Sequence, residues 1–309
     1  MKILITGGAG FIGSNIVDRY IAEGHEVAIV DNLATGRRSN LNPAASFYEV
    51  SITDAEAVRD VFERERPEVV SHHAAQMDVR RSVAEPQYDA EANIIGSINV
   101  LEAAHATGVR KLIFSSSGGA IYGDTRQMPT PESAPLQPIS HYGTSKLAGE
   151  IYIQLYGRLY GLDWTILRYA NVYGPRQNPH GEAGVTAIFG IMMLRGQRPT
   201  IFGAGDKTRD YVFVGDVVEA NLRALTRGDR EIINIGTGVQ TSDREVYDAV
   251  AAAAGYDEEP ILGPERVGDV RHSCIDASHA RDVLGWEPTV EFREGVRRAV
   301  EHQREREIG

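Results

Sequence analysis

The chain has 309 residues, 42% of them hydrophobic, and a formal net charge of −11. This length is enough for one large or two modest domains, and the negative charge argues against nucleic acid as a partner. The single cysteine, Cys274, excludes an intrachain disulfide framework and a cysteine-based zinc site, and it suits a cytoplasmic protein. The first apolar run is too short for a signal peptide or a membrane helix, so we expect no membrane partner.

Short apolar runs and helical patterns alternate through the first half of the chain. The patterns predict helices over residues 11–23, 55–65, 88–107 and 142–160. Between them lie runs that are short, β-branched and apolar, as buried parallel strands are: KILIT, EVAIVD, EVVSH, KLIFSS and WTILRY. This alternation predicts an α/β fold, a Rossmann-type doubly wound parallel sheet with helices on both faces.

The regularity fades after about residue 170, where glycine and proline become frequent. We therefore expect residues 1–170 to form a nucleotide-binding Rossmann domain. Residues 171–309 are expected to form mainly a smaller C-terminal substrate lobe, with part of the later chain crossing back to the first domain. A last helix, predicted over 292–305, is strongly charged, and we expect it to be solvated surface.

A glycine-rich loop follows the first predicted strand and opens the first predicted helix. Gly7, Gly10 and Gly13 would allow a tight turn and a close approach of the backbone to a pyrophosphate at the helix N-terminus. The first two glycines are one residue further apart than in the usual dinucleotide fingerprint. No Lys-Ser or Lys-Thr pair follows, which disfavours a mononucleotide P-loop. The loop therefore predicts a dinucleotide cofactor.

Asp31 ends the second predicted strand and bears on which dinucleotide binds. A carboxylate there can accept hydrogen bonds from both ribose hydroxyls and would repel a 2′-phosphate, which favours NAD over NADP. Arg37 and Arg38 follow closely and could instead hold a 2′-phosphate. We give Asp31 more weight and predict NAD.

Tyr142 and Lys146 are four residues apart at the start of a predicted helix, so they share one face. A free tyrosine has a pKa near 10 and is a poor base at neutral pH. A nearby ammonium, together with the positive charge of a bound nicotinamide, lowers that pKa. Tyr142 could then remove a hydroxyl proton from a substrate and return it.

His72 and His73 suggest a metal site, but neighbouring residues of a strand point to opposite faces and no further ligands cluster around them. We therefore expect no metal.

The chain resembles the extended short-chain dehydrogenase/reductase family over nearly its whole length, and more narrowly the UDP-glucose (UDP-galactose) 4-epimerases. The resemblance is carried by TGGAGFIGSN, VDNL, HHAAQMDVRRSV, NIIGSINVLEAA, SSSGGAIYG, YGTSK, LRYANVYGP, IFGAGDKTRDYVFV and RVGDVRHS. It implies an NAD-dependent isomerase that works as a homodimer. The helices over 88–107 and 142–160 expose apolar residues at helical spacing and could pair with a second copy.

The resemblance also implies that one serine beside Tyr142 binds the sugar hydroxyl. Counting along IFSSSGGAIYG from the left selects Ser117, whereas counting back from Tyr122 reaches Gly118. We choose Ser117, with a backbone bulge absorbing the extra residue and with Ser116 as the alternative.

The remaining site residues come from the same resemblance. It implies that the cofactor is bound by Gly7, Gly10, Phe11, Ile12, Gly13, Asp31, Asn32, Gly36, Ser51, Ile52, Ala74, Ala75, Asn93, Tyr142, Lys146 and Tyr169. Ser51 replaces the family's usual aspartate, which weakens the expected contact with adenine. The substrate is expected to meet Ser117, Asn171, Val185, Ile201, Phe202, Arg209, Arg266, Asp269 and Ser273. Arginines are suited to this role because their guanidinium groups bind phosphates in a bidentate manner.

Related dehydratases and decarboxylases carry acids near Ser117, where this chain has Gly119 and Ala120. We therefore expect hydride removal and return at C4 of a UDP-hexose through a transient 4-keto sugar. The expected pairs are UDP-glucose/UDP-galactose and, because Ser273 stands where a bulky tyrosine would exclude an acetamido group, UDP-N-acetylglucosamine/UDP-N-acetylgalactosamine. The alternatives are a 4,6-dehydratase, a UDP-glucuronate 4-epimerase or decarboxylase, or a non-catalytic NAD-sensing protein.

Overall fold

The computed structural model describes residues 1–179, 184–265 and 270–308. Its centre is a parallel sheet of seven strands in the order β3-β2-β1-β4-β5-β6-β11. These strands are β1 (Lys2–Thr6), β2 (Glu26–Val30), β3 (Ser46–Tyr48), β4 (Val69–His72), β5 (Lys111–Ser117), β6 (Asp163–Tyr169) and β11 (Glu231–Ile235). The predicted doubly wound α/β fold is therefore confirmed.

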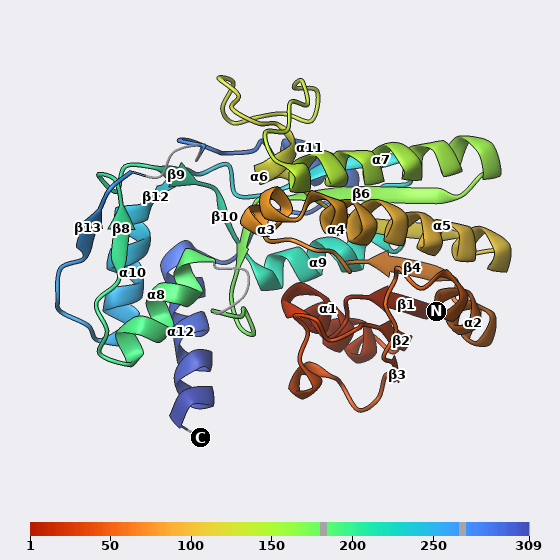
Figure 1. The fold of residues 1–309 in the computed structure, drawn as a ribbon, viewed down its shortest axis with the longest axis horizontal. Coiled ribbons are helices and arrows are strands. Elements are labelled where there is room, and N and C mark those ends of the chain that lie inside the picture. The colour runs from red at the N-terminus through yellow and green to blue at the C-terminus, as the bar shows by residue number, and fades with distance from the viewer. Residues whose placement is uncertain (180–183, 266–269, 309) are drawn as a thin grey trace.

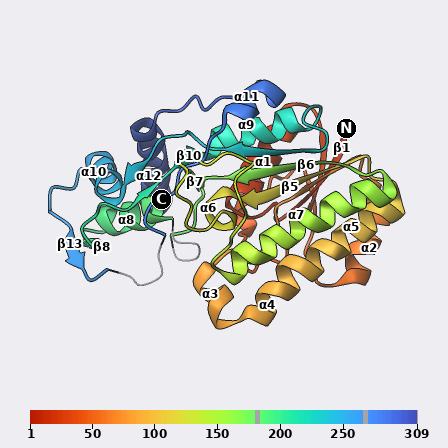
Figure 2. The same ribbon diagram turned by 90° about the horizontal axis from the view of Figure 1, so that it is seen from above.

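Helices cover both faces of this sheet, as Figure 2 shows from above. Strand β1 illustrates why, since Ile3 and Ile5 belong to one buried cluster and Leu4 to the other, as the alternation of a strand requires. One cluster includes α1 (Phe11–Ala22), α9 (Val214–Ala224) and α11 (Ser278–Leu284). The other includes α2 (Ala55–Glu65), α5 (Gly96–Thr107) and α7 (His141–Tyr160).

A second lobe lies beside the C-terminal ends of the sheet strands (Figure 1). It has its own buried cluster, built on α8 (Val185–Leu194), α10 (Asp243–Ala254) and α12 (Phe292–Ile308). Three small sheets accompany these helices: β7 (Asn171–Tyr173) with β10 (Tyr211–Phe213), β8 (Thr200–Phe202) with β13 (Ile261–Gly263), and β9 (Thr208–Arg209) with β12 (Thr241–Ser242).

The later chain does cross back, because β11 pairs with β6 in register from Glu231↔Thr165 to Ile235↔Tyr169. The prediction for the last helix was wrong in one respect. Val296 and Val300 of α12 are fully buried in the cluster of the second lobe, so one face of this charged helix is core rather than solvated surface.

The helix predicted over 88–107 is divided in the structure. It comprises α4 (Pro86–Ala90), a π-helical segment η2 (Glu91–Ile95) and α5. Short elements complete the fold: η1 (Arg38–Asn40), α3 (Val79–Ala84) and α6 (Gly118–Ile121). No helix of the described residues combines the length and the apolar character needed to cross a membrane.

Candidate active site

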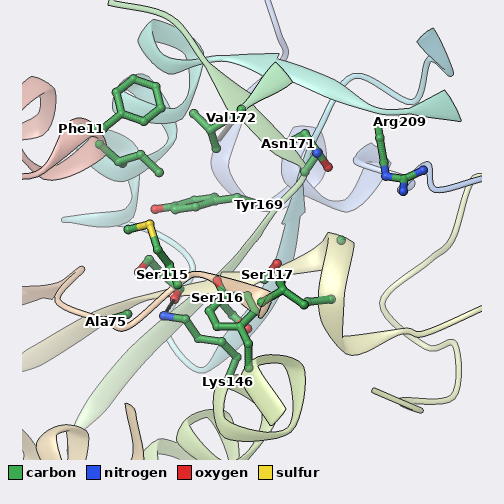
Figure 3. A pocket seen from close by; sticks show the side chains of 18 of the residues that line it. Phe11, Ala75, Ser115, Ser116, Ser117, Lys146, Tyr169, Asn171, Val172 and Arg209 are labelled. Carbon is green, nitrogen blue, oxygen red and sulfur yellow. Dashed lines mark hydrogen bonds between the residues drawn. The ribbon is translucent and has the colours of Figure 1, made fainter. Parts of the chain in front are cut away.

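A cavity of about 540 Å³ opens where the sheet meets the second lobe. Its walls come from the ends of β1, β4, β5 and β6, the start of α7, and β7 and β9, so it lies at the C-terminal edge of the parallel sheet, where such folds bind ligands. In Figure 3, Phe11 and Arg209 lie on opposite sides of this space. The cavity is lined by many of the predicted residues: Gly7, Gly10, Phe11, Ile12, Gly13, Ala75, Ser117, Tyr142, Lys146, Tyr169, Asn171 and Arg209.

The glycine loop has the geometry that a dinucleotide pyrophosphate requires. Gly7 has a φ of +72°, and a Cβ there would lie 2.7 Å from the nitrogen of Ala74. A Cβ on Gly13 would lie 2.2 Å from the carbonyl oxygen of Gly7. Gly10 is the N-cap of α1, with no side-chain cap, so this helix N-terminus is open to the cavity that the loop lines. Larger residues would close the cradle, and the residues present fit a dinucleotide.

Asp31 is buried at the end of β2, beside the loop. Its carboxylate accepts hydrogen bonds from the backbone nitrogens of Ala9 at 2.9 Å and Leu33 at 2.8 Å. Burial raises the pKa of this carboxyl, and the two backbone hydrogen bonds oppose that rise. The two arginines that could have held a 2′-phosphate have protein partners, since Arg38 pairs with Glu49 and Arg37 donates to Asn178 at 2.9 Å.

Several predicted cofactor residues do not line the cavity: Asp31, Asn32, Gly36, Ser51, Ile52, Ala74 and Asn93. Some of these residues support the loops that line the cavity. The side chain of Asn93 accepts from the backbone nitrogen of Gln76 at 2.8 Å and donates to its carbonyl oxygen at 2.8 Å. Asn93 thus holds the loop after β4, and its direct contact with a cofactor stays a prediction. Ser51 shares a hydrogen bond of 2.8 Å with Thr53.

Tyr142 and Lys146 both face the cavity from the first turns of α7. Ser140 caps this helix by accepting a hydrogen bond from the backbone nitrogen of Gly143 at 3.1 Å. Lys146 is buried, and its ammonium donates to the carbonyl oxygen of Ser115 at 2.9 Å and lies 4.9 Å from the centre of the Phe114 ring. Strand β5 therefore fixes the ammonium of Lys146 (Figure 3), and Lys146 shares a helical face with Tyr142 because the two are four residues apart on α7.

The three serines at the end of β5 differ in their partners. Ser115 donates to the carbonyl oxygen of His72 at 3.1 Å, and Ser116 donates to Glu150 at 2.5 Å. Ser117 lines the cavity, and its hydroxyl has no hydrogen-bond partner among the described residues. This geometry favours Ser117 over Ser116 as the group that meets a substrate.

The bulge that we expected beside Ser117 is absent. Strand β5 pairs with β6 without interruption from Lys111↔Asp163 to Ser117↔Tyr169. The extra residue is taken up by α6, the helical turn that begins at Gly118. A Cβ on Gly118 would lie 3.0 Å from Ile275, so this position has little room for a side chain.

His72, the last residue of β4, is buried, and His73, which follows it, is partly buried; both imidazoles are neutral. Burial, reinforced by the positive charge of Lys146, lowers the pKa of both imidazoles to about 3. His72 bonds to Thr6 and Ser97, while His73 bonds to Ser71 and stacks on Tyr169. Among the described residues, no group of three or more metal-binding side chains is found.

Several lining residues were not among the predicted site residues: His73, Met77, Val79, Arg80, Gln177, Thr186 and Tyr211. Five of them lie within HHAAQMDVRRSV and IFGAGDKTRDYVFV, two stretches that carry the family resemblance, but only the fold shows that these positions face the cavity.

Arg209 marks the far end of the cavity. Its guanidinium donates to the carbonyl oxygens of Thr208 at 2.8 Å and Val270 at 2.6 Å. These neutral acceptors orient the group without neutralising its charge, which suits it to an anionic ligand. Asn171 lies near it on the cavity wall (Figure 3).

Four other predicted substrate residues, Val185, Ile201, Phe202 and Ser273, do not line the cavity. Ser273 donates its backbone N–H to the carbonyl oxygen of Thr208 at 3.1 Å, directly before Arg209. Arg266 and Asp269 lie outside the described residues.

The strand order, the glycine loop and the Tyr142–Lys146 pair define a Rossmann-fold enzyme of the short-chain dehydrogenase/reductase type. The model of the NAD dependent epimerase/dehydratase family matches residues 3–236. The chain belongs to that family, and the predicted family, fold and NAD dependence are confirmed.

Known proteins that are similar to this chain match it over nearly its full length. A UDP-glucose 4-epimerase of Mycolicibacterium smegmatis is 48% identical, over 97% of this chain and 98% of its own. The crystal structure of a Thermotoga maritima UDP-glucose 4-epimerase with UDP-glucose is 52% identical, with a TM-score of 0.98 and 99% coverage of both chains. That of a Thermus thermophilus UDP-glucose 4-epimerase complex with NAD is 47% identical, with a TM-score of 0.94, covering 98% of this chain and 99% of that one.

Proposed function

We propose that this protein is an NAD-dependent UDP-glucose 4-epimerase. The observation that carries the proposal is the composition of the cavity wall, which combines Tyr142, Lys146 and Ser117 with no aspartate or glutamate among the described lining residues. A dehydratase or decarboxylase needs an acid or base beyond the one that serves the C4 hydroxyl. The part of the wall that the structure describes supports oxidation and reduction of a carbinol but offers no carboxylate for elimination.

The roles of the residues follow from their positions. Tyr142 accepts the proton of the sugar C4 hydroxyl and later returns it. Lys146, fixed by the carbonyl oxygen of Ser115 at 2.9 Å, keeps a positive charge on the same helical face and so favours the tyrosinate. Ser117 binds the same sugar oxygen. When bound, NAD supplies the hydride acceptor and donor at C4.

The nucleotide diphosphate is expected at the end of the cavity marked by Arg209 and Asn171. The protein is acidic overall, so a dianionic diphosphate needs a local cation there. Arg266 and Asp269 are proposed to bind the phosphate and the ribose. Ser273 is proposed to leave room for an N-acetyl group, which would add the UDP-N-acetylglucosamine pair to the substrates.

The decisive experiment mixes the purified protein with UDP-galactose without added NAD. UDP-glucose as the product supports the proposal, since the hydride removed is returned within one turnover. A dehydrated keto sugar would show a lyase instead. A protein that binds NAD but converts neither UDP-galactose nor UDP-N-acetylgalactosamine would be a sensor, and the proposal would fail.

We also propose a homodimer that forms through α7 and the η2–α5 helix beside it. The two helices lie side by side in Figures 1 and 2, and His105 of α5 stacks on Tyr160 of α7 at 4.1 Å. Their outer surface exposes large apolar side chains: Ile95 (49%), Ile151 (55%), Leu159 (61%) and Tyr160 (49%). Large apolar side chains that remain exposed on two neighbouring helices fit an interface. A sedimentation mass of one chain at micromolar concentration would refute the dimer.

We place the protein in the cytoplasm, where its single cysteine, buried and unpaired, would stay reduced. Fractionation of the source cells, followed by detection of the chain, tests this location.

A further inference from the structure

A chain of buried hydrogen bonds passes through His72, which no step of the proposed mechanism uses. Nδ1 of His72 lies 2.6 Å from the hydroxyl of Thr6, and Nε2 lies 3.0 Å from the hydroxyl of Ser97. Thr6, His72 and Ser97 are all at most 3% exposed. Groups this deep in the protein are costly unless each donor and acceptor is matched.

The direction of every bond in the chain can be worked out. Ser97 donates its one hydrogen to the carbonyl oxygen of Asn93 at 2.6 Å, so its oxygen must accept from Nε2–H of His72. Nδ1 of the neutral ring then has only a lone pair and accepts from the Thr6 hydroxyl. The Thr6 oxygen is free to accept from the backbone nitrogens of His73 at 3.2 Å and Ala74 at 3.1 Å.

At one end, this chain of hydrogen bonds holds the loops on the cofactor side of the cavity. Thr6 directly precedes Gly7 of the glycine loop, and the backbone groups that it binds begin the loop after β4. His73 and Ala75 of that loop line the cavity.

The other end reaches the catalytic helix. Ser97 secures the carbonyl oxygen of Asn93 within the π-helical segment η2, a type of irregularity that is frequent at functional sites. The amide of Asn93 donates to the hydroxyl of Ser145 at 3.1 Å, and Ser145 donates to the carbonyl oxygen of Tyr142 at 3.0 Å. The chain of hydrogen bonds therefore links the glycine loop to the backbone of Tyr142.

We propose that His72 is a positioning residue that sets the catalytic helix in register with the cofactor loops. Its Nδ1 fixes the loop that follows β4 through Thr6, and its Nε2 fixes the π-helical segment, and through it α7, by way of Ser97. The proposal rests on the proposed function for its catalytic consequence, but its effect on NAD binding does not depend on which reaction is catalysed.

The two ring nitrogens of His72 can be tested separately, because the side-chain amide of asparagine or of glutamine can take the place of one of them. In His72→Asn the amide oxygen can take the place of Nδ1 and keep the Thr6 bond, while the Ser97 bond is lost. In His72→Gln the amide nitrogen can take the place of Nε2 and keep the Ser97 bond, while the Thr6 bond is lost. Thr6→Val and Ser97→Ala remove the same bonds from the partner side. Thr6→Val also removes the hydroxyl that accepts from the backbone nitrogens of His73 and Ala74, and Ser97→Ala also removes the bond to the Asn93 carbonyl oxygen.

A matched control lies further along α5. Thr107 donates to the carbonyl oxygen of Ala103 at 2.7 Å, four residues earlier in the chain, as Ser97 does to Asn93. Thr107→Val removes an equivalent helical hydrogen bond at the end of α5 that is remote from the chain through His72.

Three measurements on the full-length, NAD-loaded protein are compared: the dissociation rate of NAD without sugar, hydrogen exchange of the amides over residues 141–147, and kcat with KM for UDP-galactose. We expect His72→Gln and Thr6→Val to release NAD at least about tenfold faster. His72→Asn and Ser97→Ala should keep NAD, exchange the α7 amides faster and lose kcat by about 10- to 100-fold with little change in KM, as a small misplacement of Tyr142 would cause. Thr107→Val should match the wild type.

Two results would overturn the proposal. One is that all four variants match Thr107→Val in both NAD release and exchange of the α7 amides. The other is that all four change both readouts to the same extent, which would show a general loss of stability. A wild-type protein without epimerase activity would refute the proposed function instead, and NAD release and amide exchange would still decide the role of His72.

Discussion

Glu150→Gln removes the charge from a buried ion pair directly behind the candidate active site. Glu150 and Arg168 have side chains that are 1% and 2% exposed, and two hydrogen bonds of 2.7 and 3.0 Å join them. Glu150 also accepts from Ser116 at 2.5 Å. The variant keeps the shape of the side chain but leaves the Arg168 guanidinium without a counter-charge. Breaking a buried pair in this way costs about 3–5 kcal/mol, a large part of the 5–15 kcal/mol typical of a folded protein.

Urea titration of the NAD-loaded protein measures this loss as a fall in the unfolding midpoint at unchanged slope. Glu259→Gln is the matched control, because Glu259 also pairs with an arginine, Arg244, at 2.7 Å but has a side chain that is 70% exposed. Solvent screens that pair, so its midpoint should stay near the wild-type value. Replacing both buried partners, Glu150→Leu with Arg168→Met, should recover most of the loss. A midpoint for Glu150→Gln as high as that of Glu259→Gln would refute the reasoning.

Three further predictions concern the site. Tyr142→Phe should lower kcat at least about a hundredfold while NAD stays bound, because the general base is lost; retention of more than a tenth of the rate would exclude this role. Ser273→Tyr should reduce turnover of the N-acetylated sugar pair far more than that of UDP-glucose and UDP-galactose, and an equal fall in both would show that Ser273 is no gate. Acidification should destabilise the fold, because His72 and His73 have pKa values lowered to about 3, whereas unfolded imidazoles bind protons below about pH 6.5. Each should cost about 2 kcal/mol between pH 7 and pH 5; urea midpoints that are equal at the two pH values would contradict this.

The sequence was most informative where a local pattern decides the structure. The five strands β1, β2, β4, β5 and β6 are buried except at some end residues, and their predicted limits agree with the structure to within a residue or two. The glycine loop was equally predictable, since the close approach of Gly13 to Gly7 requires glycine in any chain that folds this way. These features depend on neighbours in the sequence, so periodicity and residue type reveal them.

The features that were missed depend on particular side-chain and strand contacts and not on a repeating pattern. Strand β11 reads as an ordinary short apolar run, and only its pairing with β6 makes it part of the central sheet. The π-helical segment is stabilised by Ser97 and by the contact of Asn93 with Gln76, none of which a helical pattern shows. In the charged helix α12, Val296 and Val300 stand among many arginines and glutamates. The apolar pattern of this helix is therefore too sparse to reveal its buried face in the sequence.

The charges around the cavity also form a pattern that only the structure reveals. Lys146 is fixed beside β5, and its positive charge helps to keep His72 and His73 neutral. The two imidazoles therefore do not change their charge in the neutral pH range, although free imidazoles would. A pH dependence of turnover in this range would then come from another group, and the proposed mechanism assigns it to Tyr142, which exchanges a proton with the sugar. If Tyr142→Phe keeps the wild-type profile in its residual activity, another group must titrate in the site.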